Sequence, residues 1–176
     1  MRYLFLFFPL LILAQQEMYT RTQVLMGTFV SITLHKTDNL KLTKSFELIK
    51  EIEDSLSTYN PNASLFILNK SHHVQLDPYL VEAIILSRSY YEQTNGYFDI
   101  TIGAISKDLY RFGEEQTYSP SKKELQNAHL DIQGIYIDNK YIFSDENITI
   151  DLGGMGKGYA ADKVAEYLYE QNITEG

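Results

Sequence analysis

The residues best suited to chemistry lie in one glycine-rich segment, DLGGMGKGYAAD, which runs from Asp151 to Asp162. Four glycines surround Lys157, between a predicted strand and a predicted helix. Glycines let the backbone approach a ligand closely, and the N-terminus of a following helix favours negative charge. Asp151 and Lys157 also need partners if they are to stay charged when buried. The segment therefore favours a phosphate-binding site over a simple tight connection.

This segment differs from two common phosphate-binding patterns. A Walker A loop would need a glycine where Asp151 stands, and Ser or Thr where Gly158 follows the lysine. The glycines at 154, 156 and 158 give G-x-G-x-G, whereas a dinucleotide fingerprint reads G-x-G-x-x-G. The spacing therefore excludes both motifs, and it does not determine which anion the segment binds.

Strands and helices in an irregular order must position this segment. The pattern predicts a strand over 23–35 interrupted by Gly27, a hairpin over 134–144 and a buried strand over 147–152. Apolar residues spaced by three and four predict helices over about 40–56, 77–94 and 159–169. Pro78 suits the first turn of the second helix, and Asn95-Gly96 suits its end. The mixed order predicts an α+β fold.

The amino-acid composition excludes or disfavours several classes of function. The chain has 176 residues and a net charge of -8, from 15 basic and 23 acidic side chains, which disfavours a nucleic-acid partner. It contains no cysteine, so disulfides, thiolate metal sites and cysteine nucleophiles are excluded. Any metal must be held by oxygen or imidazole ligands.

The N-terminus carries a predicted export signal. An apolar run from Tyr3 to Ala14 follows Arg2 and contains Pro9. It is shorter than the roughly 20 apolar residues that a membrane span needs. We expect residues 1–16 to be a signal peptide, residues 17–176 to form one domain, and the mature protein to lie on the periplasmic side of the cytoplasmic membrane. Membrane association would occur at most through an uncleaved signal segment.

Four segments in order resemble the FAD:protein FMN transferase family, also called the ApbE family. They are LMGT at 25–28, STYNPNAS at 57–64 followed by Leu68-Asn69, GYFDITIG at 96–103, and the glycine-rich segment. The resemblance covers only the N-terminal part of a typical member. It implies an ApbE-like mixed sheet with packed helices, truncated at the C-terminus.

The resemblance also implies a reaction. FAD is split at its pyrophosphate, FMN is esterified to a threonine of an acceptor protein with Mg²⁺, and AMP leaves. The implied acceptors are flavoprotein subunits of membrane redox complexes, or exported flavoproteins. If residue 176 is the natural end, we expect weak or absent transferase activity, because the family keeps further Mg²⁺ ligands downstream. A periplasmic FAD-binding protein and an FAD pyrophosphatase remain alternatives.

Individual roles follow from the same resemblance. Lys157 is the expected catalytic residue near the phosphates, and the carbonyl of Gly154 is an expected Mg²⁺ ligand. The expected FAD-binding residues are Met26, Tyr59, Tyr97, Phe98, Asp99, Asp151 and Lys157. Each has a structural alternative: a methionine can be core, an aromatic residue can cover the core or pack in a strand, and Asp99 can cap a turn.

Overall fold

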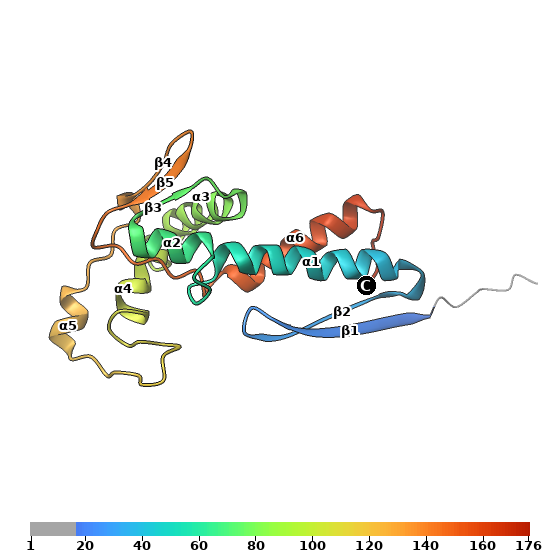
Figure 1. Ribbon diagram of the computed structural model, residues 1–176, viewed down its shortest axis with the longest axis horizontal. Coiled ribbons are helices and arrows are strands. Elements are labelled where there is room, and N and C mark those ends of the chain that lie inside the picture. The colour runs from blue at the N-terminus through green and yellow to red at the C-terminus, as the bar shows by residue number, and fades with distance from the viewer. Residues whose placement is uncertain (1–16) are drawn as a thin grey trace, which may run out of the picture.

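Residues 17–176 are described by the computed structural model, which combines helices with short antiparallel strands (Figure 1). The predicted signal peptide, residues 1–16, lies outside the described residues. The strands are β1 (Met18–Leu25), β2 (Thr28–His35), β3 (His73–Gln75), β4 (Ile135–Ile137) and β5 (Tyr141–Ser144). The α-helices are α1 (Asn39–Leu56), α2 (Ser64–Ser71), α3 (Pro78–Gln93), α4 (Gly103–Ser106), α5 (Lys122–Asn127) and α6 (Gly156–Glu170). Short 3₁₀ turns are η1 (Lys36–Asp38), η2 (Ile100–Ile102) and η3 (Ile132–Gly134).

The helix predictions are confirmed, and each has a local cause. On α1, the buried apolar side chains recur every three or four residues, as an amphipathic helix requires. Asp77 caps α3, because its side chain accepts hydrogen bonds from the N–H groups of Tyr79 and Leu80. Pro78 follows Asp77 as the first residue of the helix, where its ring fits the first turn. Beyond α3, Asn95 and Gly96 both take positive φ, which stops the helix. Helix α6 begins at Gly156, earlier than the predicted residue 159.

The N-terminal strand prediction is wrong in one respect, because the chain reverses at Gly27 instead of continuing. β1 and β2 form an antiparallel hairpin in which Leu25 pairs with Thr28. Met26 (φ 52°) and Gly27 (φ 68°) are the two turn residues, and positive φ at both positions is typical of type I′ hairpin turns. The Met26 N–H donates to Oε1 of Glu53 at 2.7 Å, which ties the turn to α1.

The core lies around α1. The hairpin runs along α1, and α6 packs against the same helix (Figure 1). A second, three-stranded sheet has the order β3-β5-β4, and its β4–β5 hairpin over 134–144 was predicted. Large, fully buried side chains connect these parts: Leu34, Leu42, Ile52, Leu65, Leu68, Leu80, Ile84, Ile100, Ile132, Ile135, Ile142 and Ile148.

The prediction of a strand over 147–152 is wrong, because this segment pairs with neither sheet of the described residues. Ile148, Ile150 and Leu152 are buried in alternation, as the sequence pattern indicated. The side-chain amide of Asn69 takes the place of a neighbouring strand: it donates to the carbonyl of Ile150 and accepts from its N–H, each at 2.8 Å. The N–H of Asp151 donates to the carbonyl of Ile100 at 2.8 Å. These bonds fix the entry to the glycine-rich segment.

Within residues 17–176, no helix combines the length and apolar character that crossing a membrane requires.

Candidate functional site

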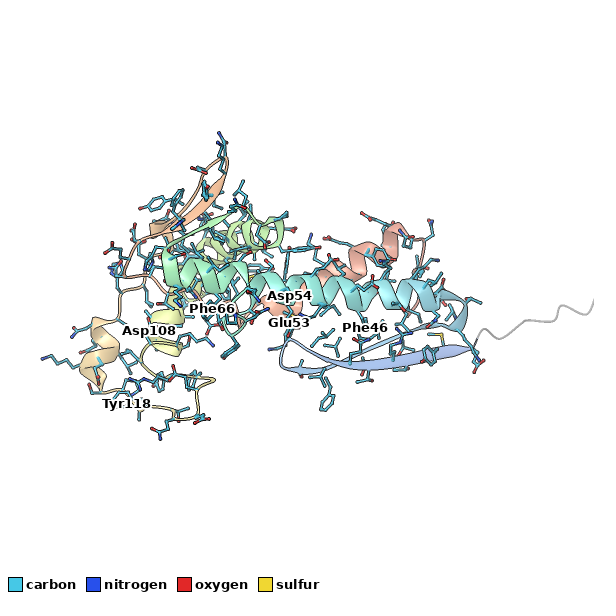
Figure 2. All side chains as sticks on the ribbon, in the orientation of Figure 1. Phe46, Glu53, Asp54, Phe66, Asp108 and Tyr118 are labelled. Atoms are coloured by element: carbon cyan, nitrogen blue, oxygen red, sulfur yellow. The ribbon has the colours of Figure 1, made fainter. Side chains whose placement is uncertain are left out.

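A cavity of about 380 Å³ opens where the β1–β2 turn, the end of α1 and the start of α6 meet. Figure 2 labels Glu53 at the end of α1 that faces this turn. The lining residues come from four distant parts of the chain: Met26, Gly27, Glu53, Leu56, Ser57, Thr58, Tyr59, Lys107, Asp151, Leu152, Gly153, Gly156 and Lys157. The volume is in the lower part of the range of small-molecule sites, roughly 300–1,000 Å³.

Asp151 is held rigidly at the wall of the cavity. Its Oδ2 accepts a hydrogen bond from the hydroxyl of Ser106 at 2.6 Å, and its Oδ1 accepts from the N–H of Gly153 at 2.8 Å. The Nζ of Lys107 lies 3.8 Å from Oδ2. Two hydrogen bonds and a nearby ammonium group surround a side chain that is only 17% exposed, so the carboxylate has a fixed position.

The glycine-rich turn leads into an open helix N-terminus. Met155 is buried, and its Sδ accepts a hydrogen bond from the Ser87 hydroxyl at 3.0 Å, which anchors the turn to α3. Met155 provides no side-chain cap for α6. The N–H groups of Lys157 and Gly158 have no backbone acceptor among residues 17–176. The positive end of the helix dipole therefore faces solvent beside the cavity.

Met26 and Lys157 both line the cavity. Lys157 is exposed, so the expectation of a buried lysine is wrong: the side chain starts from the first turn of α6, at the open mouth of the cavity. A Cβ added at Gly156 would lie 3.5 Å from the terminal methyl carbon of Met26, so this methionine packs against the glycine-rich turn. The hairpin turn thus meets the start of α6 directly.

Tyr59 forms an aromatic wall of the cavity with its side chain largely exposed (61%). Its hydroxyl accepts a hydrogen bond from Lys107 Nζ at 2.6 Å and donates to the carbonyl of Phe112 at 3.3 Å. Lys107 Nζ also lies 4.3 Å from the centre of the Tyr59 ring. Gly113 (φ +95°) packs against this ring so closely that a Cβ there would overlap it.

Tyr97, Phe98 and Asp99 do not line the cavity. The Tyr97 side chain is 96% exposed, and the Phe98 ring packs edge-on against Tyr90 with ring centres 5.7 Å apart. Asp99 caps η2, because its Oδ1 accepts hydrogen bonds from the N–H and the hydroxyl of Thr101 at 2.8 and 2.7 Å. A Cβ added at Gly154 would lie 3.7 Å from the Phe98 ring, so this ring packs against the glycine-rich turn from outside the cavity. Contact of the segment with FAD stays a prediction.

Gly154 is exposed on the same turn but lies outside the cavity lining. Its carbonyl accepts no backbone hydrogen bond from residues 17–176, so a lone pair is available for a hard cation. The described part of the chain contains no group of three or more histidine or acidic side chains that could hold a metal ion. It therefore offers one of the expected Mg²⁺ ligands.

The roles of three residues that build this site were not predicted. Ser106 ends the short helix α4 and Lys107 follows it, and a segment this short has no periodicity that directs either side chain toward Asp151. Asn69 was part of a recognised segment, but its role in holding Ile150 depends on a contact across 81 residues of chain.

A charged cluster fixes α6 to α3 near the cavity. The buried Tyr159 donates to Glu82 Oε2 at 2.6 Å, and Lys163 lies 2.6 Å from Glu82 Oε1. Burial, followed by the hydrogen bond to Glu82, raises the pKa of the Tyr159 phenol. Burial alone would raise the pKa of Glu82, but hydrogen bonds from Lys163 and Tyr159 lower it overall. Hydrogen bonds to Glu82 and Glu166 raise the pKa of Lys163.

The amino-acid sequence is similar to a protein-family model and to curated relatives. The model of the ApbE family matches residues 26–176. A curated relative named FAD:protein FMN transferase, from Klebsiella pneumoniae (strain 342), is 25% identical over 172 residues, covering 93% of this chain and 54% of the relative. Another of that name, from Vibrio cholerae serotype O1, is 30% identical over 168 residues, covering 84% and 48%. The chain thus spans about half the length of the curated relatives it matches.

Solved structures have the same fold. The flavin transferase ApbE from Vibrio cholerae gives a TM-score of 0.77 at 24% identity, covering 89% of this chain and 55% of that one. The ApbE protein of Thermotoga maritima also gives 0.77, at 22% identity, covering 87% and 53%. The predicted α+β fold with packed helices is confirmed. Within residues 17–176 all paired strands are antiparallel, so the described part of the chain contains no mixed sheet.

Proposed function

The chain belongs to the ApbE family, and on this premise we propose that it takes part in FAD:protein FMN transfer. In the proposed reaction a threonine hydroxyl of an acceptor flavoprotein attacks the phosphorus on the FMN side of the diphosphate. A phosphoester bond forms to the threonine, the bond between that phosphorus and the bridging oxygen breaks, and AMP leaves. The hydroxyl proton passes to a base. The name of the curated relatives supports this proposal.

One observation carries the proposal: the cavity combines an exposed aromatic wall with a cationic side chain beside an open helix N-terminus. Tyr59 offers a ring on which a planar flavin or adenine can stack. Lys157 and the free N–H groups at the start of α6 offer positive charge and donors to a phosphate. FAD contains both kinds of group, planar rings and a diphosphate.

The roles proposed for the other residues follow from their positions. Lys157 binds the diphosphate and stabilises charge that develops on the leaving AMP, which is how phosphoryl-transfer sites gain most of their rate. Asp151 accepts hydrogen bonds that hold the turn, and it presents a carboxylate edge to the ligand. Met26 closes the cavity beside the turn. The proposed contact of Tyr97, Phe98 and Asp99 with FAD rests on the family resemblance, because none of the three lines the cavity.

We further propose that activity depends on Mg²⁺, with the Gly154 carbonyl as one ligand. Bound Mg²⁺ would neutralise part of the negative charge of the FAD diphosphate. Because residues 17–176 offer this carbonyl without an acidic cluster, they do not by themselves fit the ion. The metal proposal rests on the family resemblance.

The proposed acceptors are flavoprotein subunits of membrane redox complexes, encountered on the periplasmic side of the membrane. The apolar run from Tyr3 to Ala14 supports export, since it has the length of a signal peptide core. The mass-shift assay described next tests both the activity and the identity of the acceptor.

A mass-shift assay tests the function. The mature protein, extended to its natural stop codon, is incubated with FAD, Mg²⁺ and a flavoprotein acceptor domain, with and without EDTA, and the acceptor is analysed by mass spectrometry. We expect the acceptor to gain one FMN on a threonine, only with Mg²⁺, and to gain much less with Lys157→Ala. Lys140→Ala, an exposed lysine in the β4–β5 turn, is the matched control. FAD binding without any mass gain would overturn transfer and favour a binding protein, and AMP release without mass gain would favour a pyrophosphatase.

A further inference from the structure

A second lysine, Lys107, holds its ammonium group at the cavity wall formed by Tyr59. The side chain is only 18% exposed. Its Nζ donates to the Tyr59 hydroxyl at 2.6 Å and to the Phe112 carbonyl at 3.5 Å. An ammonium group that has lost most of its water needs other partners for its charge.

The Asp151 carboxylate forms an ion pair with Lys107 but no direct hydrogen bond. Nζ lies 3.8 Å from Oδ2 of Asp151, beyond a hydrogen bond. That oxygen already accepts from Ser106, and the other carboxylate oxygen accepts from Gly153. Lys107 therefore has neutral oxygens as its close acceptors, and a lysine gains more from donating to an anion.

Lys107 and Lys157 reach the cavity from different elements. Lys107 follows α4, whereas Lys157 belongs to the first turn of α6, and both line the same space with Asp151. A dinucleotide diphosphate carries two negative charges and presents non-bridging oxygens on both phosphorus atoms. Two lysines on separate elements can bind both phosphates.

On the basis of the proposed function, we propose that Lys107 is a phosphate-binding residue for the diphosphate of FAD. When FAD enters, the ammonium group donates to a non-bridging phosphate oxygen instead of the Tyr59 hydroxyl. The Tyr59 ring then contacts the ligand without this bond. Without ligand, the same lysine keeps Tyr59 against the cavity.

A purely structural role for Lys107 makes a different prediction. If the lysine only positioned Tyr59, its removal would weaken every flavin that stacks on the ring. If it binds phosphate, its removal would weaken FAD and leave riboflavin, which has no phosphate, nearly unaffected.

The experiment measures dissociation constants for FAD and riboflavin by quenching of flavin fluorescence, using the full chain with Lys107→Met. We expect FAD binding to weaken about 10- to 100-fold, the usual loss for a hydrogen bond to a charged group, while riboflavin changes by less than about twofold. Lys107→Arg should retain most of the FAD affinity because it keeps the charge. Lys140→Met is the control for loss of one positive charge at an exposed site and should leave both constants unchanged.

Three outcomes separate the alternatives. Equal weakening of FAD and riboflavin, or unchanged FAD binding, would overturn the role of Lys107 and leave the proposed function standing. A wild-type chain that binds no flavin would overturn the proposed function itself. If circular dichroism shows that Lys107→Met is unfolded, Lys107→Gln gives the same decision, because it removes the charge and keeps a polar group.

Discussion

Replacing Asn69 by alanine tests whether this side chain holds the entry to the glycine-rich turn. Its amide makes two 2.8 Å hydrogen bonds with the backbone of Ile150, a residue with no exposed surface. The substitution leaves a buried N–H and a buried carbonyl without their partners. At about 1–2 kcal/mol for each unsatisfied group, unfolding free energy should fall by about 2–4 kcal/mol.

Urea unfolding of the full chain, followed by far-UV circular dichroism, measures this loss. With a slope of about 2 kcal/mol per molar urea, the midpoint should fall by about 1–2 M. Asn127→Ala, at the exposed end of α5, is the matched control and should change the midpoint little. Asn69→Asp keeps the acceptor but faces the Ile150 carbonyl with a charged oxygen, so we expect at least as large a loss. A change below about 0.5 kcal/mol in Asn69→Ala, the usual range for surface substitutions, would refute the reasoning.

The remaining predictions concern the Tyr59 contact and the α3–α6 cluster. Gly113→Ala should destabilise the chain by about 1–3 kcal/mol and weaken flavin binding, because it adds a Cβ at positive φ against the Tyr59 ring. Gly158→Ala, which meets open space, should be neutral or slightly stabilising; thermal melts followed by circular dichroism measure both substitutions. Glu82 has a lowered pKa, so its bond to Lys163 stabilises the fold above the ordinary carboxyl pKa of 4.5 and is lost as pH falls through the lowered value. Melting temperatures from pH 3 to 7 should therefore separate wild type from Glu82→Gln near neutrality and converge in acid; a constant difference would contradict this linkage.

Local patterns in the sequence determined the three longest helices, α1, α3 and α6, whereas the shorter α2, α4 and α5 were not predicted. The apolar spacing on α1, the Asp77–Pro78 start of α3 and the Asn95-Gly96 stop all act within a few residues, so they can be read without the fold. The same holds for the β4–β5 turn, where Asp138 accepts hydrogen bonds from the N–H groups of Lys140 and Tyr141. The resemblance also identified the family and four residues of the cavity: Met26, Tyr59, Asp151 and Lys157.

Tertiary structure alone decided which groups complete the site. Lys107 reaches Tyr59 and Asp151 because α4 packs beside them, and no local periodicity encodes that approach. Residues 147–152 would form a strand only beside a neighbouring strand. In this structure the side chain of Asn69, on α2, makes the hydrogen bonds to Ile150 instead. Sequence patterns record the preferences of neighbouring residues, whereas hydrogen bonds and charges in a cavity depend on segments brought together only by folding.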